Sequence, residues 1–161
     1  MNKKYGKLNQ EADKLKHKHE SLKDLIPAIS QLVADNSRSL PEKYEPKSIL
    51  ESRFTPAEAA FEKGMRSCGA IANISASILR RLGYKVKLIH GECKESVDHA
   101  WISVLDPKTN MWSEYDLTRK DADVPDTHIK KDEIESWEDI RGQIESDHET
   151  MIERRKERGL K

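Results

Sequence analysis

The sequence predicts an α+β domain in which a central helix packs on a small antiparallel sheet, with N- and C-terminal helices flanking this core. Residues 67–82 carry apolar side chains at helical spacing, three strand-like segments follow between residues 84 and 117, and both ends of the chain show helical periodicity. The length of 161 residues suits one hydrophobic core rather than two. The expected single domain at 1–161 comprises an N-terminal helical extension at 1–47, a core at about 48–120 and a C-terminal helical extension at 121–161.

The N-terminal extension has the pattern of an amphipathic helix over residues 6–34. Apolar or tolerated positions recur at alternating spacings of four and three, which marks one face of a helix packed on the domain. Pro27 interrupts this stripe, so we expect a kink or a junction of two helices near Leu25–Pro27. Residues 36–56 contain three prolines and should form an irregular connection with short helical pieces. The stripe consists of Leu8, Ala12, Leu15, His19, Leu22, Ile26, Ile29 and Val33.

The central helix is expected over Ser67–Leu82. Its apolar positions fall at helical spacing with small residues between them, which indicates close packing on several sides. Gly83 is a suitable residue to end it. Cys68 then lies at the helix N-terminus, where the positive end of the helix dipole favours a thiolate over a thiol.

Three strands should follow, at Tyr84–Gly91, His99–Leu105 and Met111–Leu117. Residues 106–110 read DPKTN, which is a strong turn signal between the last two strands. If the hairpin loop consists of residues 106–109, strand pairing sets His99 directly opposite Asp116 on the same face. From about Asp132, a plausible N-cap, the pattern becomes helical again to the end of the chain.

These positions bring together the three groups that thiol catalysis needs. A free cysteine titrates at about 8.5 and is mostly neutral at pH 7, so it needs help to ionise. A histidine within hydrogen-bond reach accepts the thiol proton and later returns it to the leaving group. A carboxylate on the other ring nitrogen orients the histidine and stabilises the imidazolium. Cys68, His99 and Asp116 are the candidate nucleophile, base and orienting acid.

The core resembles the transglutaminase-like superfamily of papain-like folds. The resemblance covers about residues 60–120 and rests on three stretches in order, GMRSCGAIANISASILRRLGYKVKLIHG, DHAWISV and MWSEYDLT. It implies that Cys68, His99 and Asp116 form a catalytic triad. It also implies an enzyme that attacks an amide carbonyl of a peptide or protein through an acyl-enzyme, by hydrolysis or acyl transfer, with no cofactor. The superfamily includes inactive relatives, so a non-catalytic binding or scaffold module is the alternative.

Two features of the site stay open at the level of sequence. Papain-like enzymes commonly take a second oxyanion donor from a glutamine or tryptophan before the cysteine, whereas all three tryptophans here follow Cys68. Zinc held by Cys68, Cys93 and His99, with Asp98 or Asp116, is disfavoured because the short CxxC or HxxxH pairs of such sites are missing. Cys93 is expected to be exposed in a polar loop, and four further histidines are expected to be solvated: His17, His19, His128 and His148.

Composition excludes several other classes of function. Lysine plus arginine and aspartate plus glutamate number 29 each and no segment is strongly basic, so we expect no nucleic-acid partner. No apolar run approaches the length of a membrane span, and the first residues lack the apolar stretch of a signal peptide. Two cysteines are too few for a disulfide framework. We therefore expect a protein of the reducing cytoplasm. The resemblance implies that its partner is a peptide or protein substrate.

Overall fold

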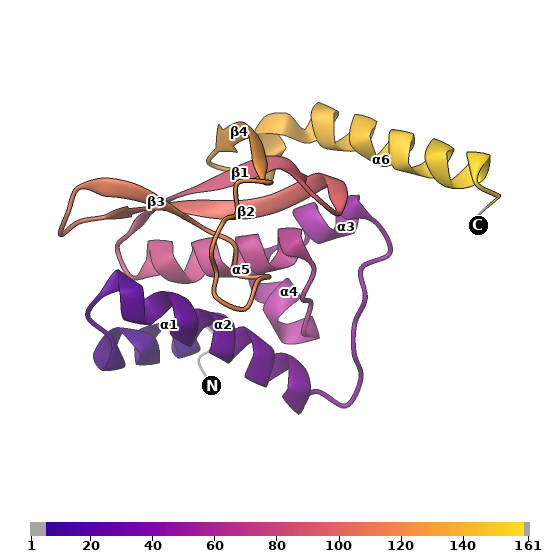
Figure 1. Ribbon diagram of the computed structural model, residues 1–161. Helices are drawn as coiled ribbons and strands as arrows, with labels where there is room; N and C mark the ends of the chain where they lie inside the picture. Colours follow the sequence, from indigo (N-terminus) through magenta and orange to yellow (C-terminus); the bar gives the residue numbers. More distant parts are fainter. Residues whose placement is uncertain (1–5, 160–161) are drawn as a thin grey trace.

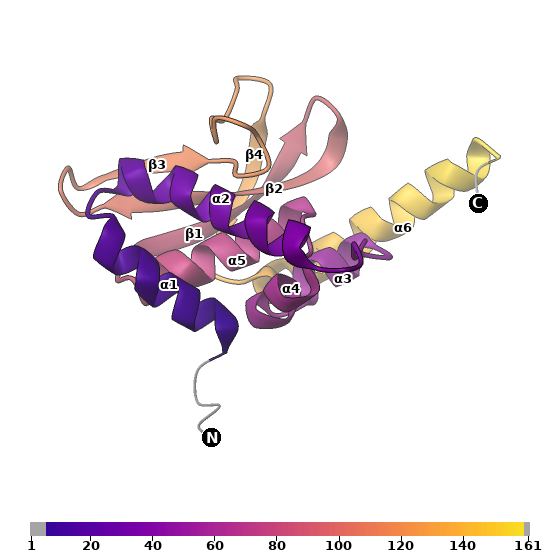
Figure 2. The same ribbon diagram turned by 90° about the horizontal axis from the view of Figure 1, so that it is seen from below.

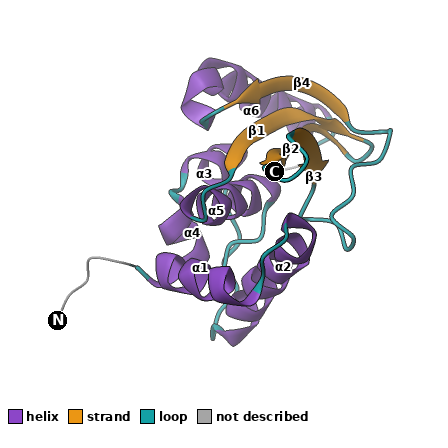
Figure 3. Ribbon diagram, turned by 90° about the vertical axis from the view of Figure 1, so that its left-hand side faces the viewer, coloured by secondary structure: helices purple, strands orange, loops and turns teal. Residues whose placement is uncertain are grey.

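The computed structural model describes residues 6–159, which form three layers (Figure 1). The outer layer holds α1 (Lys7–Lys18) and α2 (Leu22–Ser39). The middle layer holds α5 (Cys68–Arg81) together with α3 (Ile49–Phe54) and α4 (Ala57–Lys63). The third layer is the sheet, and Figure 3 shows α1 and α2 on the side of α5 that faces away from it. A central helix on an antiparallel sheet with flanking helices is therefore confirmed.

The N-terminal stripe folds as two helices, but they do not meet at Pro27. The break lies at residues 19–21, where the Ser21 side chain caps α2 by accepting a hydrogen bond from the Asp24 N–H at 3.2 Å. Pro27 lies inside α2, which continues through it. Leu8, Ala12 and Ile29 are among the stripe residues buried in the same hydrophobic cluster as α5 and the sheet. The capping serine, rather than the proline, thus decides where the second helix begins.

The central helix forms where the sequence predicts it. Ser67 is the N-cap of α5. Gly83 follows the C-terminal end of this helix with a φ of +96°, a left-handed conformation that glycine adopts without strain. Ala70, Ile74 and Ile78 are fully buried, which places α5 at the centre of the core. Its first residue, Cys68, remains partly accessible.

The sheet contains β1 (Lys85–Cys93), β2 (Ser96–Asp106), β3 (Met111–Tyr115) and β4 (Ile129–Ile134), in the order β3-β2-β1-β4 with antiparallel neighbours throughout. The β2–β3 register differs from the expected one by two residues, because Asp106 pairs with Met111 and the loop is residues 107–110. Asp116 lies just beyond β3 and is not directly opposite His99. A shift of two residues preserves the side-chain face, so both residues still lie on one face.

The region after residue 128 differs from the sequence prediction. Asp132 does not cap a helix, since it lies in β4 and pairs with His90 of β1. The helical part begins later, with η1 (Trp137–Ile140), whose cap is Ser136, and α6 (Arg141–Glu157). The C-terminal end of α6 points away from the rest of the molecule in both Figures 1 and 2. The strand IKKDEI was missed because an edge strand rich in charged residues lacks the apolar pattern of a core strand.

Within residues 6–159, no helix combines the length and the apolar character needed to cross a membrane.

Candidate active site

Cys68 is the first residue of α5, and the N-terminus beside it carries no side-chain cap. The Ser67 hydroxyl, which stands at the N-cap, instead shares a hydrogen bond of 2.8 Å with the Ser52 hydroxyl. The first backbone N–H groups of a helix have no partner within the helix, and they concentrate positive potential at its N-terminus. The thiol therefore lies where an anion is stabilised.

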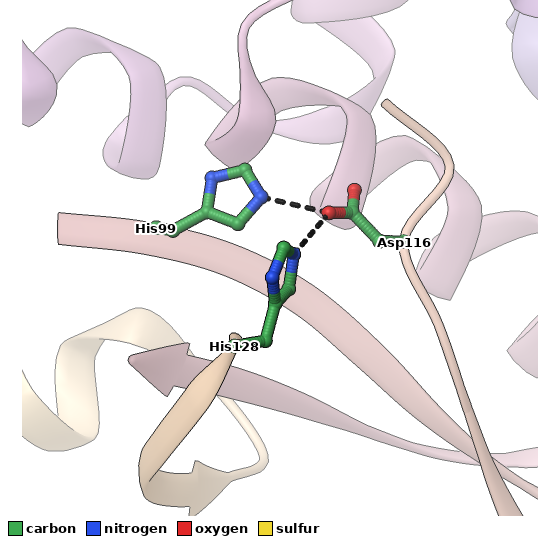
Figure 4. Close-up of side chains that lie close together, drawn as sticks. All are labelled: His99, Asp116 and His128. Atoms are coloured by element: carbon green, nitrogen blue, oxygen red, sulfur yellow. Dashed lines mark hydrogen bonds and ion pairs between the residues drawn. The ribbon is translucent and has the colours of Figure 1, made fainter. Parts of the chain in front are cut away.

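His99 and Asp116 meet despite the changed strand register. The His99 Nε2–H donates to Asp116 Oδ2 at 2.8 Å, as Figure 4 shows. The other carboxylate oxygen, Oδ1, accepts from the Thr118 N–H at 3.0 Å and from its hydroxyl at 2.5 Å. The Asp116 N–H donates to the Ala122 carbonyl at 3.1 Å. The turn after β3 thus fixes a fully buried carboxylate against the imidazole.

The ionisation of the three groups is coupled. Burial alone would raise the pKa of the Cys68 thiol, but a hydrogen bond with His99 and the positive charge of Arg53 outweigh it and lower that pKa. Burial likewise opposes the charged form of His99, yet Asp116 and Cys68 raise the pKa of its imidazole to about 10. For Asp116, burial is outweighed by hydrogen bonds from His99, Thr118 and His128, which lower its pKa to about 2. These directions favour a thiolate, an imidazolium and a carboxylate.

Comparisons with known proteins identify the family of the chain and a solved structure with a similar fold. The family model of the transglutaminase-like superfamily matches residues 9–117. The chain belongs to this superfamily. A solved structure described as the crystal structure of a TGase superimposes with a TM-score of 0.52 at 20% identity, over 78% of this chain and 32% of that one. The chain thus spans about a third of that structure's length, and at this identity the likeness concerns the fold. No curated protein sequence matches the chain.

The superfamily match covers Cys68, His99 and Asp116, but it ends before a fourth residue of the site. The side chain of His128 is only 2% exposed, and its Nε2–H donates to the same Asp116 oxygen at 2.8 Å (Figure 4). Its ring lies edge-on to His99 at 5.1 Å between centroids, and 4.9 Å from Trp101. The expectation that His128 is solvated is therefore wrong. Its sequence surroundings, VPDTHIKKD, are polar, and only the folding-back of residues 117–128 buries it.

Arg53 and Asp98 are two further buried residues beside the thiol, of which only Asp98 is a candidate from the sequence, as an alternative ligand in the disfavoured zinc set. The Arg53 guanidinium donates to Asp98 Oδ1 at 2.8 Å and to Cys68 Sγ at 3.5 Å. Their side chains are 1% and 0% exposed. Arginine is mostly exposed in proteins, so the short helix ILESRF gives no signal that its arginine is buried beside the thiol.

Two groups of side chains have the ligand types and spacing of a metal site within the described part of the chain. They are His99, Asp116 and His128, and His90, Asp98 and Asp147, in each of which the ligand atoms lie within 4.8 Å of one another. Hydrogen bonds already join the members of the first group through the Asp116 carboxylate. In the second group, the arginine cation bound to Asp98 opposes a second positive charge. Neither of these two groups is the set of Cys68, Cys93 and His99 that was considered for zinc from the sequence.

Proposed function

We propose that this protein is a cysteine-nucleophile enzyme that attacks an amide carbonyl of a peptide or protein. The observation that supports it most is a thiol at an uncapped helix N-terminus, whose pKa burial would raise but His99 and Arg53 lower, while a buried carboxylate holds the Nε2–H of the His99 imidazole at 2.8 Å. Superfamily membership supports the same chemistry. Because the nucleophile must stay reduced, we expect the enzyme to work in a reducing compartment such as the cytoplasm.

The proposed reaction has two half-reactions. The Cys68 thiolate attacks the carbonyl carbon, the C–N bond breaks, and the imidazolium of His99 gives its proton to the departing amine. In the second half-reaction, water or an acceptor amine attacks the thioester carbonyl while the neutral imidazole takes its proton. The C–S bond then breaks and Cys68 is released. Asp116 keeps the His99 Nε2–H in place throughout, so that Nδ1 is the nitrogen that exchanges the proton. Backbone N–H groups at the α5 N-terminus are the proposed donors to the oxyanion.

Alkylation by iodoacetamide tests the nucleophile without knowledge of the substrate. In a Cys93→Ser background, Cys68 should react with an inflection well below that of a free thiol, and His99→Ala should remove the acceleration. The reciprocal Cys68→Ser protein, which retains Cys93, supplies the free-thiol comparison. Equal reactivity of the two cysteines, or a native Cys68 that does not react, would contradict the proposal and leave a binding module.

The reaction type is decided by mass spectrometry of peptides incubated with the protein and a primary amine. Proteolysis would cleave the peptide backbone. Side-chain hydrolysis would deamidate a glutamine, and transamidation would attach the amine to that glutamine. Each product should vanish with Cys68→Ala. A product that persists with Cys68→Ala does not come from the proposed nucleophile.

A further inference from the structure

The thiol of Cys68 has a second cationic neighbour besides His99. Arg53 comes from α3, and its Nη1 lies 3.5 Å from Cys68 Sγ, while its Nη2 lies 2.8 Å from Asp98 Oδ1. The guanidinium carbon is 5.0 Å from the centre of the Trp137 ring, which adds a cation–π contact. The arginine is thus held on three sides, in a fixed position beside the nucleophile.

Gly69 leaves the space that this guanidinium occupies. A Cβ at residue 69 would lie 2.5 Å from Arg53 Nη1, 2.6 Å from Ser52 Oγ and 2.9 Å from the Ser52 carbonyl oxygen. These separations are shorter than real contacts of a Cβ atom. The residue after the nucleophile must therefore lack a side chain for the arginine to reach the thiol.

A buried cation at the N-terminus of a helix is unfavourable by itself. It adds to the positive end of the helix dipole, and a buried charge needs a partner. Asp98 is one partner, but it is shared with a second cationic group, because His90 Nε2 lies 3.3 Å from the same Asp98 oxygen. The Arg53 Nε has no hydrogen-bond partner among the described residues. Asp98 occupies only Nη2 of the guanidinium, so Nη1 presents positive charge directly to Cys68 Sγ, where it would stabilise a thiolate.

His90 anchors Asp98 from the other side. The His90 ring is fully buried, with Nδ1 3.0 Å from Asp132 of β4 and Nε2 3.2 Å from Asp147 of α6. Burial alone would lower the pKa of His90, but Asp98 and Asp132 raise it, which favours an imidazolium. The chain of contacts thus runs from the thiol through Arg53 and Asp98 to three further elements of the fold.

We propose that Arg53 is a further catalytic residue, whose guanidinium stabilises the Cys68 thiolate, and that Asp98 is the positioning residue that holds it there. This inference rests on the proposed function, since it assigns a role at the same nucleophile. It predicts opposite effects for the two partners of one ion pair. Removing the cation destabilises the thiolate, whereas neutralising the competing anion stabilises it.

The test is the pH profile of Cys68 alkylation by iodoacetamide in the full chain with Cys93→Ser. Arg53→Met should move the inflection up by about one pH unit, which makes alkylation below the inflection about tenfold slower. Asp98→Asn keeps an acceptor oxygen for the guanidinium and removes the anion, so it should move the inflection down, with alkylation about threefold faster there. Arg53→Lys should restore part of the loss. Arg38→Met removes an exposed arginine from α2 and should leave the profile unchanged.

Opposite signs for Arg53→Met and Asp98→Asn cannot come from a general loss of structure. An Arg53→Met profile equal to that of the parent, or shifts in one direction for both variants, would overturn the role of Arg53. If Arg53→Met does not fold because Asp98 is left unpaired, the sign of the Asp98→Asn shift decides. A parent protein whose Cys68 titrates like a free thiol would instead overturn the proposed function.

Discussion

Replacing Asp116 by asparagine keeps the shape of the side chain and changes its hydrogen-bonding character. In the native protein, Oδ1 accepts from Thr118 and Oδ2 accepts from both His99 and His128. The asparagine oxygen will satisfy Thr118, whose two donors lie on one side, so the amide NH2 will face the histidines. His99 must then offer a bare Nε2 to a donor and carry its proton on Nδ1. That tautomer cannot accept the proton of Cys68.

The structure sets the size of the loss. The pKa of His99 rises from 6.5 to about 10 through Asp116 and Cys68 together, which corresponds to about 5 kcal/mol. The pKa of Asp116 falls from 3.8 to about 2, which corresponds to about 2 kcal/mol. The thiolate adds to the rise at His99, and Thr118 and His128 add to the fall at Asp116, so the smaller figure is an upper bound for the bond between the carboxylate and His99. A weakening of at most about 2 kcal/mol predicts alkylation of Cys68 up to about 30-fold slower near pH 6.

The assay is the iodoacetamide rate between pH 5 and 9 in the Cys93→Ser background. His128→Phe is the matched control, because it removes the other imidazole from the same Asp116 oxygen and leaves the His99 contact in place. It should retain the low inflection of the thiol. An Asp116→Asn protein that folds and reacts at the parent rate would refute the assignment of Asp116 as the orienting acid. The same loss in His128→Phe would show that packing, not the carboxylate–His99 bond, controls the thiol.

Two further predictions concern stability. Because the pKa of Asp116 is lower in the folded protein, the folded state binds fewer protons than the unfolded one between pH 4 and 2. The contribution of Asp116 to stability should be complete above about pH 4 and fall by about 2 kcal/mol as the pH falls through 2. Urea titrations of the parent and Asp116→Asn proteins at several acidic pH values measure this, and parallel pH dependence in the two would contradict it. Gly91→Ala should destabilise the fold by about 1–3 kcal/mol, because the new Cβ would lie 2.2 Å from a β4 carbonyl oxygen and 2.6 Å from the Trp101 ring. Thermal unfolding checks it against Gly142→Ala, where no atom lies within 4 Å, and equal effects of the two substitutions would argue against the clash.

The β2–β3 hairpin has a different register from the predicted one, yet His99 and Asp116 still lie on the same face of the sheet. Residues 107–110 close the turn rather than 106–109, so the expected direct pairing of His99 with Asp116 is wrong. Both registers put the two residues on one face, because side chains alternate with a period of two. The turn after β3, which carries Thr118, then brings the carboxylate to the imidazole.

The missed parts of the site share one property. His128, Arg53 and Asp98 are polar or charged, although each has an apolar residue beside it in the sequence, Ile129, Phe54 and Val97 respectively. Such residues are mostly exposed, so sequence gives no reason to bury them. Each is buried by a partner far along the chain, as Arg53 is by Asp98, 45 residues away.

The central helix with Cys68 at its N-terminus, the first three strands, and the order of thiol, imidazole and carboxylate can all be predicted from the sequence. These follow from periodicity, turn residues and helix ends, which depend on neighbours within a few positions. The edge strand β4, the second imidazole on Asp116 and the arginine beside the thiol depend instead on the folded arrangement of the chain. A buried charge is stable only where distant segments supply its partner, and that pairing exists only after the chain has folded.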